Sequence, residues 1–118
     1  MSSPAFARAI KSALVDPVST TTSSRLQPDD SSITDSLGWA LYIKGDLPEA
    51  VSLLERAAQG QPADPSINEH LGDAYYAAGR HYEARYAWRA ALVYADAKAS
   101  GRLRAKIDTG LRPDLTAP

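Results

Sequence analysis

Cysteine is absent from this 118-residue chain, and no long run of apolar residues occurs in it. The missing cysteine excludes disulfide bonds, thiolate metal sites and cysteine nucleophiles. No apolar stretch approaches the roughly 20 residues that a membrane-spanning helix needs, so we expect no membrane span. The composition, 44% hydrophobic and 23% charged, is typical of one globular domain with a single core and little volume for a deep substrate cavity.

Groups that could carry catalysis or hold a cofactor are scarce. His70 and His81 are the only histidines, and neither stands in a known motif. His70, with Glu69 and Asp73 close by in the sequence, could contribute to a weak metal site, but we expect it to be a surface residue. We expect His81 to lie in a turn or at a helix start. The sequence has no glycine-rich phosphate loop and no G-x-S-x-G motif, so we expect no catalytic activity, no metal and no cofactor.

Acidic and basic residues are unevenly distributed, although the net charge is only −1. Residues 29–79 contain nine acidic and two basic side chains, whereas residues 80–112 contain three acidic and eight basic ones. Such an asymmetry concerns the choice of partners more than the fold, because charge patterning guides association.

The chain repeats itself with a period of 34 residues. When residues 31–64 are aligned with residues 65–98, eleven positions are identical. The identical pairs include Leu37 and Leu71, Gly38 and Gly72, Gly45 and Gly79, and Ala50 and Ala84. A repeat of this length is the signature of a stacked helical architecture.

Each repeat unit is predicted to contain two helices around a glycine turn. In the first unit the apolar residues recur at helical spacing before Gly45 and again after it. Asp46 and Glu49 fit a capping box at the start of the second helix, where Pro48 is tolerated in the first turn. No segment shows the alternation of a strand, so the predicted fold class is all-α. Trp88 occupies a core position of the second unit, and we expect the glycines Gly38 and Gly72 to allow close helix packing.

The two units resemble the tetratricopeptide repeat (TPR), a 34-residue helix-turn-helix repeat. The first unit matches its pattern with Leu37, Gly38, Leu41, Ala50, Leu54, Ala57 and Pro62. The second matches it with Leu71, Gly72, Tyr75, Ala84, Trp88 and Ala91, with Asp96 in place of the proline. The tryptophan of the family's fourth position is replaced by Thr34 and Asn68. The segments are also similar to the terminal repeats of long bacterial TPR proteins.

The resemblance implies a short α-solenoid of two TPR repeats and a C-terminal capping helix. The expected segments are a short N-terminal helix and a Ser/Thr-rich linker (1–30), the repeats 31–64 and 65–98, the capping helix 99–111 within a domain that ends at residue 112, and a tail (113–118). Arg8 and Lys11 lie inside the N-terminal apolar stretch, which is a poor fit to a secretory signal peptide. The sequence is therefore compatible with a location in the cytoplasm or in the periplasm.

In the TPR family the inner surface of each first helix binds extended peptides. Carried over by position, the resemblance implies a groove formed by Asp35, Trp39, Tyr42, Glu69, Asp73 and Tyr76. This groove is aromatic and acidic, and it lacks the Lys and Asn with which some members hold a peptide carboxylate. We therefore expect it to bind a neutral or basic protein segment.

The basic residues near the C-terminus permit two interpretations. Arg85, Arg89, Arg102 and Arg104 form either a solvated face or a basic patch for an acidic partner. Nucleic acid is not favoured, because aromatic residues for base stacking are missing from this region.

These patterns leave two hypotheses for the function. The first is a non-catalytic scaffold that binds a peptide or protein segment in its groove. The alternative is an assembly module that self-associates or completes a TPR stack with another repeat protein. Two repeats are fewer than the three or so usually needed for a continuous core. The first helix therefore needs a cover, which could be the N-terminal helix, a second copy of the chain or a partner.

Overall fold

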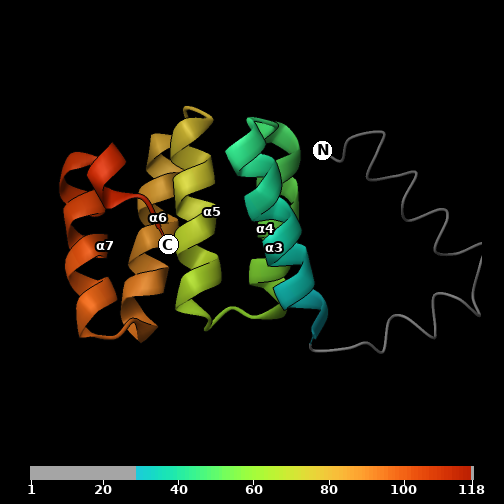
Figure 1. Cartoon of the computed structure of the whole chain (residues 1–118). Coiled ribbons are helices and arrows are strands. Elements are labelled where there is room, and N and C mark those ends of the chain that lie inside the picture. The colour runs from blue at the N-terminus through green and yellow to red at the C-terminus, as the bar shows by residue number, and fades with distance from the viewer. Residues whose placement is uncertain (1–28, 118) are drawn as a thin grey trace, which may run out of the picture.

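The computed structural model describes residues 29–117, so the predicted N-terminal helix and nearly all of the predicted linker lie outside the described residues. The described chain is all-α, without strands, as predicted (Figure 1). The elements are α3 (Asp29–Lys44), α4 (Leu47–Gly60), α5 (Pro65–Ala77), α6 (His81–Tyr94), α7 (Ala97–Thr109) and a short 3-10 turn, η1 (Pro113–Leu115).

The helices pack in consecutive pairs, as the two repeat units predict. α3 packs against α4 and α5 against α6, while contacts between α4 and α5 join the two pairs. The last helix, α7, packs on α6 at one end of the row, and α3 lies at the opposite end (Figure 1). Each helix contacts mainly its neighbours in the row, which is the arrangement of a solenoid.

Two glycines form the turns inside the helix pairs. Gly45, with φ of +99°, follows α3, and Gly79, with φ of +85°, follows α5. Both lie in the left-handed region, where a residue with a Cβ atom is strained. The glycine spacing in the sequence therefore predicts the turns correctly.

Aspartate side chains cap two helices. Asp64 accepts hydrogen bonds from two backbone N–H groups of the first turn of α5, at 2.9 and 3.1 Å. Asp96 accepts one from the backbone N–H of Ala99 at 2.8 Å. These bonds satisfy donors that a helix start leaves free. The cap at Asp96 starts the capping helix at Ala97, two residues before the predicted boundary at residue 99.

The capping box predicted for α4 is wrong. Asp46 occupies the N-cap position, but its side chain makes no capping hydrogen bond. Pro48 stands in the first turn and has no N–H group, which removes one of the donors that a capping side chain would serve. The Asp46 carboxylate instead lies 3.9 Å from the ammonium group of Lys44.

The core consists of two neighbouring clusters of buried side chains. One lies where α4, α5 and α6 meet and contains Val51, Leu54, Leu71, Ala74 and Ala87. The other lies where α6 meets α7 and contains Ala84, Trp88, Ala91 and Leu103. The partly buried Tyr75 packs against both clusters, which makes the core continuous from α4 to α7.

Close helix packing depends on two glycines at equivalent repeat positions, as predicted. A Cβ atom on Gly38 would lie 2.8 Å from Cγ of Leu54, and a Cβ atom on Gly72 would overlap the indole ring of Trp88. Trp88 is fully buried and cannot move aside easily. The prediction of Trp88 as a core residue is confirmed.

We expect Gly72→Ala to destabilise the protein, because the new methyl group overlaps Trp88 in a packed core. Overpacking of this kind costs about 1–3 kcal/mol. The matched control is Gly101→Ala in α7, where a Cβ atom meets nothing within 4 Å. That change should stabilise the helix by about 0.5–1 kcal/mol. Urea unfolding of the two variants measures both effects, and equal effects would contradict the packing described here.

Candidate functional site

The inner face is the surface on which side chains of α3, α5 and α7 meet. It contains the six predicted groove residues, together with His70 and two cations of α7. Its members are Asp35, Trp39, Tyr42, Glu69, His70, Asp73, Tyr76, Arg102 and Lys106. The face has two parts: an ion cluster between α5 and α7, and an aromatic cluster between α3 and α5.

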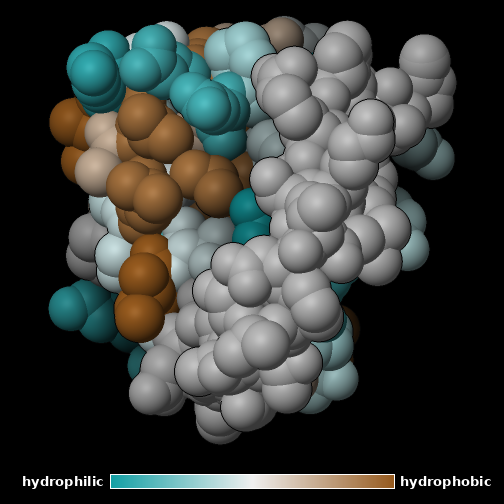
Figure 2. Space-filling model, turned by 90° about the vertical axis from the view of Figure 1, so that its right-hand side faces the viewer, coloured by the Kyte–Doolittle hydropathy of each residue, from teal (hydrophilic) through white to brown (hydrophobic). Residues whose placement is uncertain are grey.

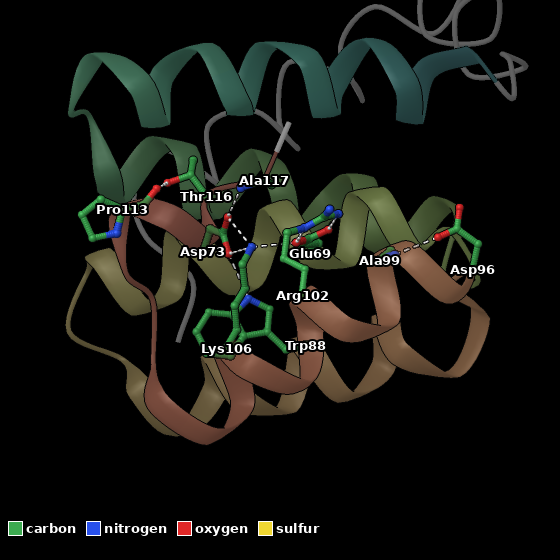
Figure 3. A network of polar contacts seen from close by, with 10 residues as sticks. All are labelled: Glu69, Asp73, Trp88, Asp96, Ala99, Arg102, Lys106, Pro113, Thr116 and Ala117. Atoms are coloured by element: carbon green, nitrogen blue, oxygen red, sulfur yellow. Dashed lines mark hydrogen bonds and ion pairs between the residues drawn. The ribbon is translucent and has the colours of Figure 1, made fainter.

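The ion cluster is centred on Lys106, whose side chain is completely buried. Its Nζ donates hydrogen bonds to Glu69 Oε2 at 2.6 Å and to Asp73 Oδ1 at 2.9 Å (Figure 3). Arg102 donates two hydrogen bonds to the Glu69 carboxylate, each 2.7 Å long. Trp88 donates its indole N–H to Asp73 Oδ1 at 3.0 Å. Two carboxylates and two cations therefore neutralise one another between α5 and α7.

The spacing of these four residues explains why they meet. Glu69 and Asp73 are four residues apart on α5, and Arg102 and Lys106 are four residues apart on α7, so each pair shares one helix face. Packing of α7 along the row brings the two faces together. A buried charge needs a charged and hydrogen-bonded partner, and here each charge has one.

The cluster shifts the pKa values of its two carboxyl groups in opposite directions. Burial by itself would raise the pKa of Glu69, but the hydrogen bonds from Arg102 and Lys106 outweigh it and hold that pKa below its ordinary value. Burial raises the pKa of Asp73, and the Lys106 ammonium group offsets this only in part. The charged form of Asp73 is therefore stabilised less by its surroundings than the charged form of Glu69.

The ion cluster corrects the prediction of an open acidic groove at the second repeat. Glu69 and Asp73 are buried, and their charge is taken up by α7. Tyr76, the third predicted residue there, stacks on His81 with ring centroids 3.8 Å apart. The capping helix thus covers the part of the groove in which the sequence suggests a free negative surface.

The predicted basic patch is also smaller than expected. Arg102 is bonded to Glu69, and Arg85 donates a hydrogen bond from Nε to the carbonyl oxygen of Ile107 at 2.9 Å. Both side chains thus hold α7 in place. Arg89 and Arg104 are exposed. Two of the four arginines are therefore structural, so neither a solvated face nor a basic patch includes all four.

The aromatic cluster contains the predicted residues of the first repeat and one that was predicted wrongly. The ring of Trp39 stacks on Tyr42 and on His70, with centroid distances of 4.5 and 4.1 Å. His70 Nδ1 lies 2.8 Å from Asp35 Oδ1. His70 is buried rather than a surface residue, because it stands on the side of α5 that packs against α3. Asp35, Trp39 and Tyr42 thus form one group with His70.

Residues 112–117, which follow α7, return to the inner face. The Leu115 and Ala117 side chains are buried, 9% and 7% exposed. The backbone N–H of Ala117 donates a hydrogen bond to Asp73 Oδ2 at 3.3 Å (Figure 3). Residues 113–118 were predicted as a C-terminal tail. Leu115 is the one large apolar residue in that segment, and it was the only signal that the segment packs.

Lys106 is a functional residue that sequence reasoning missed. It stands three residues after Leu103 and directly before Ile107, on the side of α7 that faces the core. A lysine on the side of a helix that faces the core needs buried carboxylates opposite it. Glu69 and Asp73, with their matching spacing on α5, could have been identified as those carboxylates.

Within residues 29–117, no three His, Asp or Glu side chains are grouped so that they could hold a metal ion. None of the helices in that range is long and apolar enough to span a membrane.

We expect Lys106→Met to destabilise the fold strongly, because it leaves the buried carboxylate of Asp73 without its cation, whereas Glu69 keeps Arg102. Losing one partner of a buried ion pair costs about 3–5 kcal/mol. Without Lys106, burial raises the folded-state pKa of Asp73 further, so the folded state binds more protons than the unfolded state. The stability of the variant should therefore rise as the pH falls from 7.5 to 5.

Urea unfolding at the two pH values tests this expectation. Lys98→Met is the matched control, because Lys98 lies on the same helix and is exposed. It should change the stability little at either pH. A Lys106→Met variant that is as stable as this control would contradict the ion cluster.

Comparison with known proteins agrees with the helix pairing. A family model described as TPR repeat matches residues 38–79, which run from α3 through α4 and α5 to Gly79. Comparison with curated proteins and with solved structures gave no significant match. The matched segment covers the second part of α3, all of α4 and all of α5, and the described helices pack pairwise as in TPR repeats. The chain therefore contains a tetratricopeptide repeat, at residues 38–79.

Proposed function

We propose that this protein is a non-catalytic interaction module that holds an extended segment of a partner protein on its inner face. TPR repeats generally serve as protein interaction modules. The proposed site is the part of the inner face that starts at the aromatic cluster and continues to Asp73.

The observation that carries the proposal is the position of the chain's own C-terminal segment. Residues 112–117 lie on the inner face as a peptide ligand would, with two apolar side chains buried and one backbone N–H bonded to a carboxylate. In peptide recognition, main-chain hydrogen bonds give affinity and pockets for side chains give specificity. A surface that accommodates this segment has the chemistry to accommodate a similar one from a partner.

The charges on the inner face determine which kind of partner segment binds there most favourably. Glu69 and Asp73 are neutralised by Arg102 and Lys106, and Asp35 is bonded to His70. The face thus offers little free negative charge, which favours a neutral segment over a strongly basic one. Trp39 and Tyr42 are only partly buried, and both are suited to anchor an apolar side chain.

A pair of neighbouring substitutions tests the proposal in the full chain. Leu115→Asp places a charge in the buried anchor of the C-terminal segment and should release it from the inner face. Thr116→Asp adds the same charge at an exposed neighbouring position and should leave the segment bound. The probe is a fluorescent peptide with the sequence of residues 111–118, LRPDLTAP, titrated in a polarisation assay.

We expect saturable binding of this peptide to the Leu115→Asp variant, at least tenfold tighter than to the Thr116→Asp variant. A peptide with the same residues in scrambled order should bind neither variant. Equal binding of the native and scrambled peptides, or no binding to the Leu115→Asp variant, would overturn the proposal.

A further inference from the structure

A hollow of about 190 Å³ lies beside Ala117, near the N-terminal ends of α5 and α7. Its polar lining includes Glu69 and His70 of α5, Arg102 of α7 and the capping residue Asp96. Figure 3 shows Glu69 and Arg102 between Ala117 and Asp96. The hollow therefore continues the inner face from the C-terminal segment to the start of α7.

The chain's own C-terminal segment borders this hollow with a methyl group only. Ala117 is 7% exposed, and its backbone N–H is bonded to Asp73. A longer side chain at this position would have the hollow next to it. A partner segment that follows the same path can thus make a side-chain contact that the chain's own segment lacks.

One carboxylate at the hollow has no cationic partner among residues 29–117. Glu69 is paired with Arg102 and Lys106, so its charge is balanced. Asp96 is exposed, accepts a hydrogen bond from the backbone N–H of Ala99, and forms no ion pair within the described range. A cation placed in the hollow would be attracted to Asp96, whereas an anion would be repelled by it.

His70 contributes a hydrogen-bond acceptor to the lining. Its Nδ1 lies 2.8 Å from Asp35 Oδ1. An ionised carboxylate only accepts hydrogen bonds, so this contact assigns the proton of the neutral ring to Nδ1 and leaves Nε2 as an acceptor. Stacking on Trp39 fixes the orientation of the ring. The hollow is therefore suited to a side chain that donates hydrogen bonds.

We propose that this hollow is a specificity subsite that takes one basic side chain, of lysine or arginine, at the position of Ala117 in the bound segment. The inference rests on the proposed function, because it requires a partner segment that follows the path of residues 112–117. A basic side chain has N–H donors for Asp96 and His70, and an acidic one has none. A single basic residue is compatible with a segment that is otherwise neutral.

Two peptides test the subsite in the Leu115→Asp variant. They are LRPDLTKP and LRPDLTEP, in which lysine or glutamate replaces the alanine of the probe LRPDLTAP. We expect the lysine peptide to bind at least fivefold more tightly than the glutamate peptide, and more tightly than the natural probe. The polarisation assay measures all three affinities.

Asp96→Asn, added to the same variant, tests the cause of the preference. Asparagine caps a helix about as well as aspartate, so the change removes the charge and keeps the start of α7. The preference for lysine over glutamate should fall to twofold or less. Asp64→Asn is the matched control, because Asp64 caps α5 in the same way and does not line the hollow. It should leave the preference unchanged.

Two outcomes would overturn the subsite and leave the proposed function standing. One is equal binding of the lysine and glutamate peptides while the natural probe binds. The other is a preference that Asp64→Asn reduces as much as Asp96→Asn does, since the effect would then be one of overall charge.

If no peptide binds, the proposed function fails, and the subsite is tested in the full chain, where the C-terminal segment is already attached. The backbone amide at position 117 should exchange at least fivefold more slowly in Ala117→Lys than in Ala117→Glu. Such a difference would support the basic preference of the hollow, and equal exchange rates would overturn it.

Discussion

The buried ammonium group of Lys106 is the interaction on which the inner face depends. It joins α7 to α5 through two carboxylates, and no apolar residue could take its place without leaving Asp73 with no charged partner in the interior. Asp73 is the shared acceptor of this arrangement, because it receives hydrogen bonds from Lys106, from the Trp88 indole and from the backbone of Ala117. The capping helix, the core and the C-terminal segment are thus held at one carboxylate.

This arrangement makes the two ends of the short helix row different. At the α7 end, Arg102 and Lys106 are paired with carboxylates of α5, and polar residues face the solvent. At the α3 end, Ile33, Leu37 and Ile43 are exposed among the described residues, and Figure 2 shows apolar side chains gathered at this end. A solenoid needs polar caps at both ends to be complete by itself. The described part of the chain has such a cap at the α7 end only.

The periodic features of the sequence predicted most of the fold. The 34-residue repeat predicted the helix pairs, and Gly45 and Gly79 predicted the turns. Gly72 predicted close helix packing and Trp88 a core position, and the structure shows that these two residues are in contact. These features are local or depend on spacing within one repeat, so a single sequence is sufficient to find them. The TPR repeat model matches residues 38–79, a range that includes Gly45, Gly72 and Gly79.

The candidate site was predicted less well, because its contacts join residues far apart in the sequence. Glu69 and Arg102 are brought together only when α7 folds over the inner face, and the buried position of His70 depends on how α3 packs against α5. Position within the repeat identified Glu69 and Asp73 as inner-face residues. It did not show that α7 occupies the groove in front of them.

Hydrogen exchange at two N–H groups measures the central claim most directly. The Trp88 indole and the Ala117 backbone amide both donate to Asp73, the first to Oδ1 and the second to Oδ2. The account predicts that NMR shows both groups exchanging much more slowly than in an unstructured peptide of the same sequence. An Ala117 amide that exchanges at the unstructured rate while the Trp88 indole is protected would contradict it, since the C-terminal segment would then not lie on the inner face.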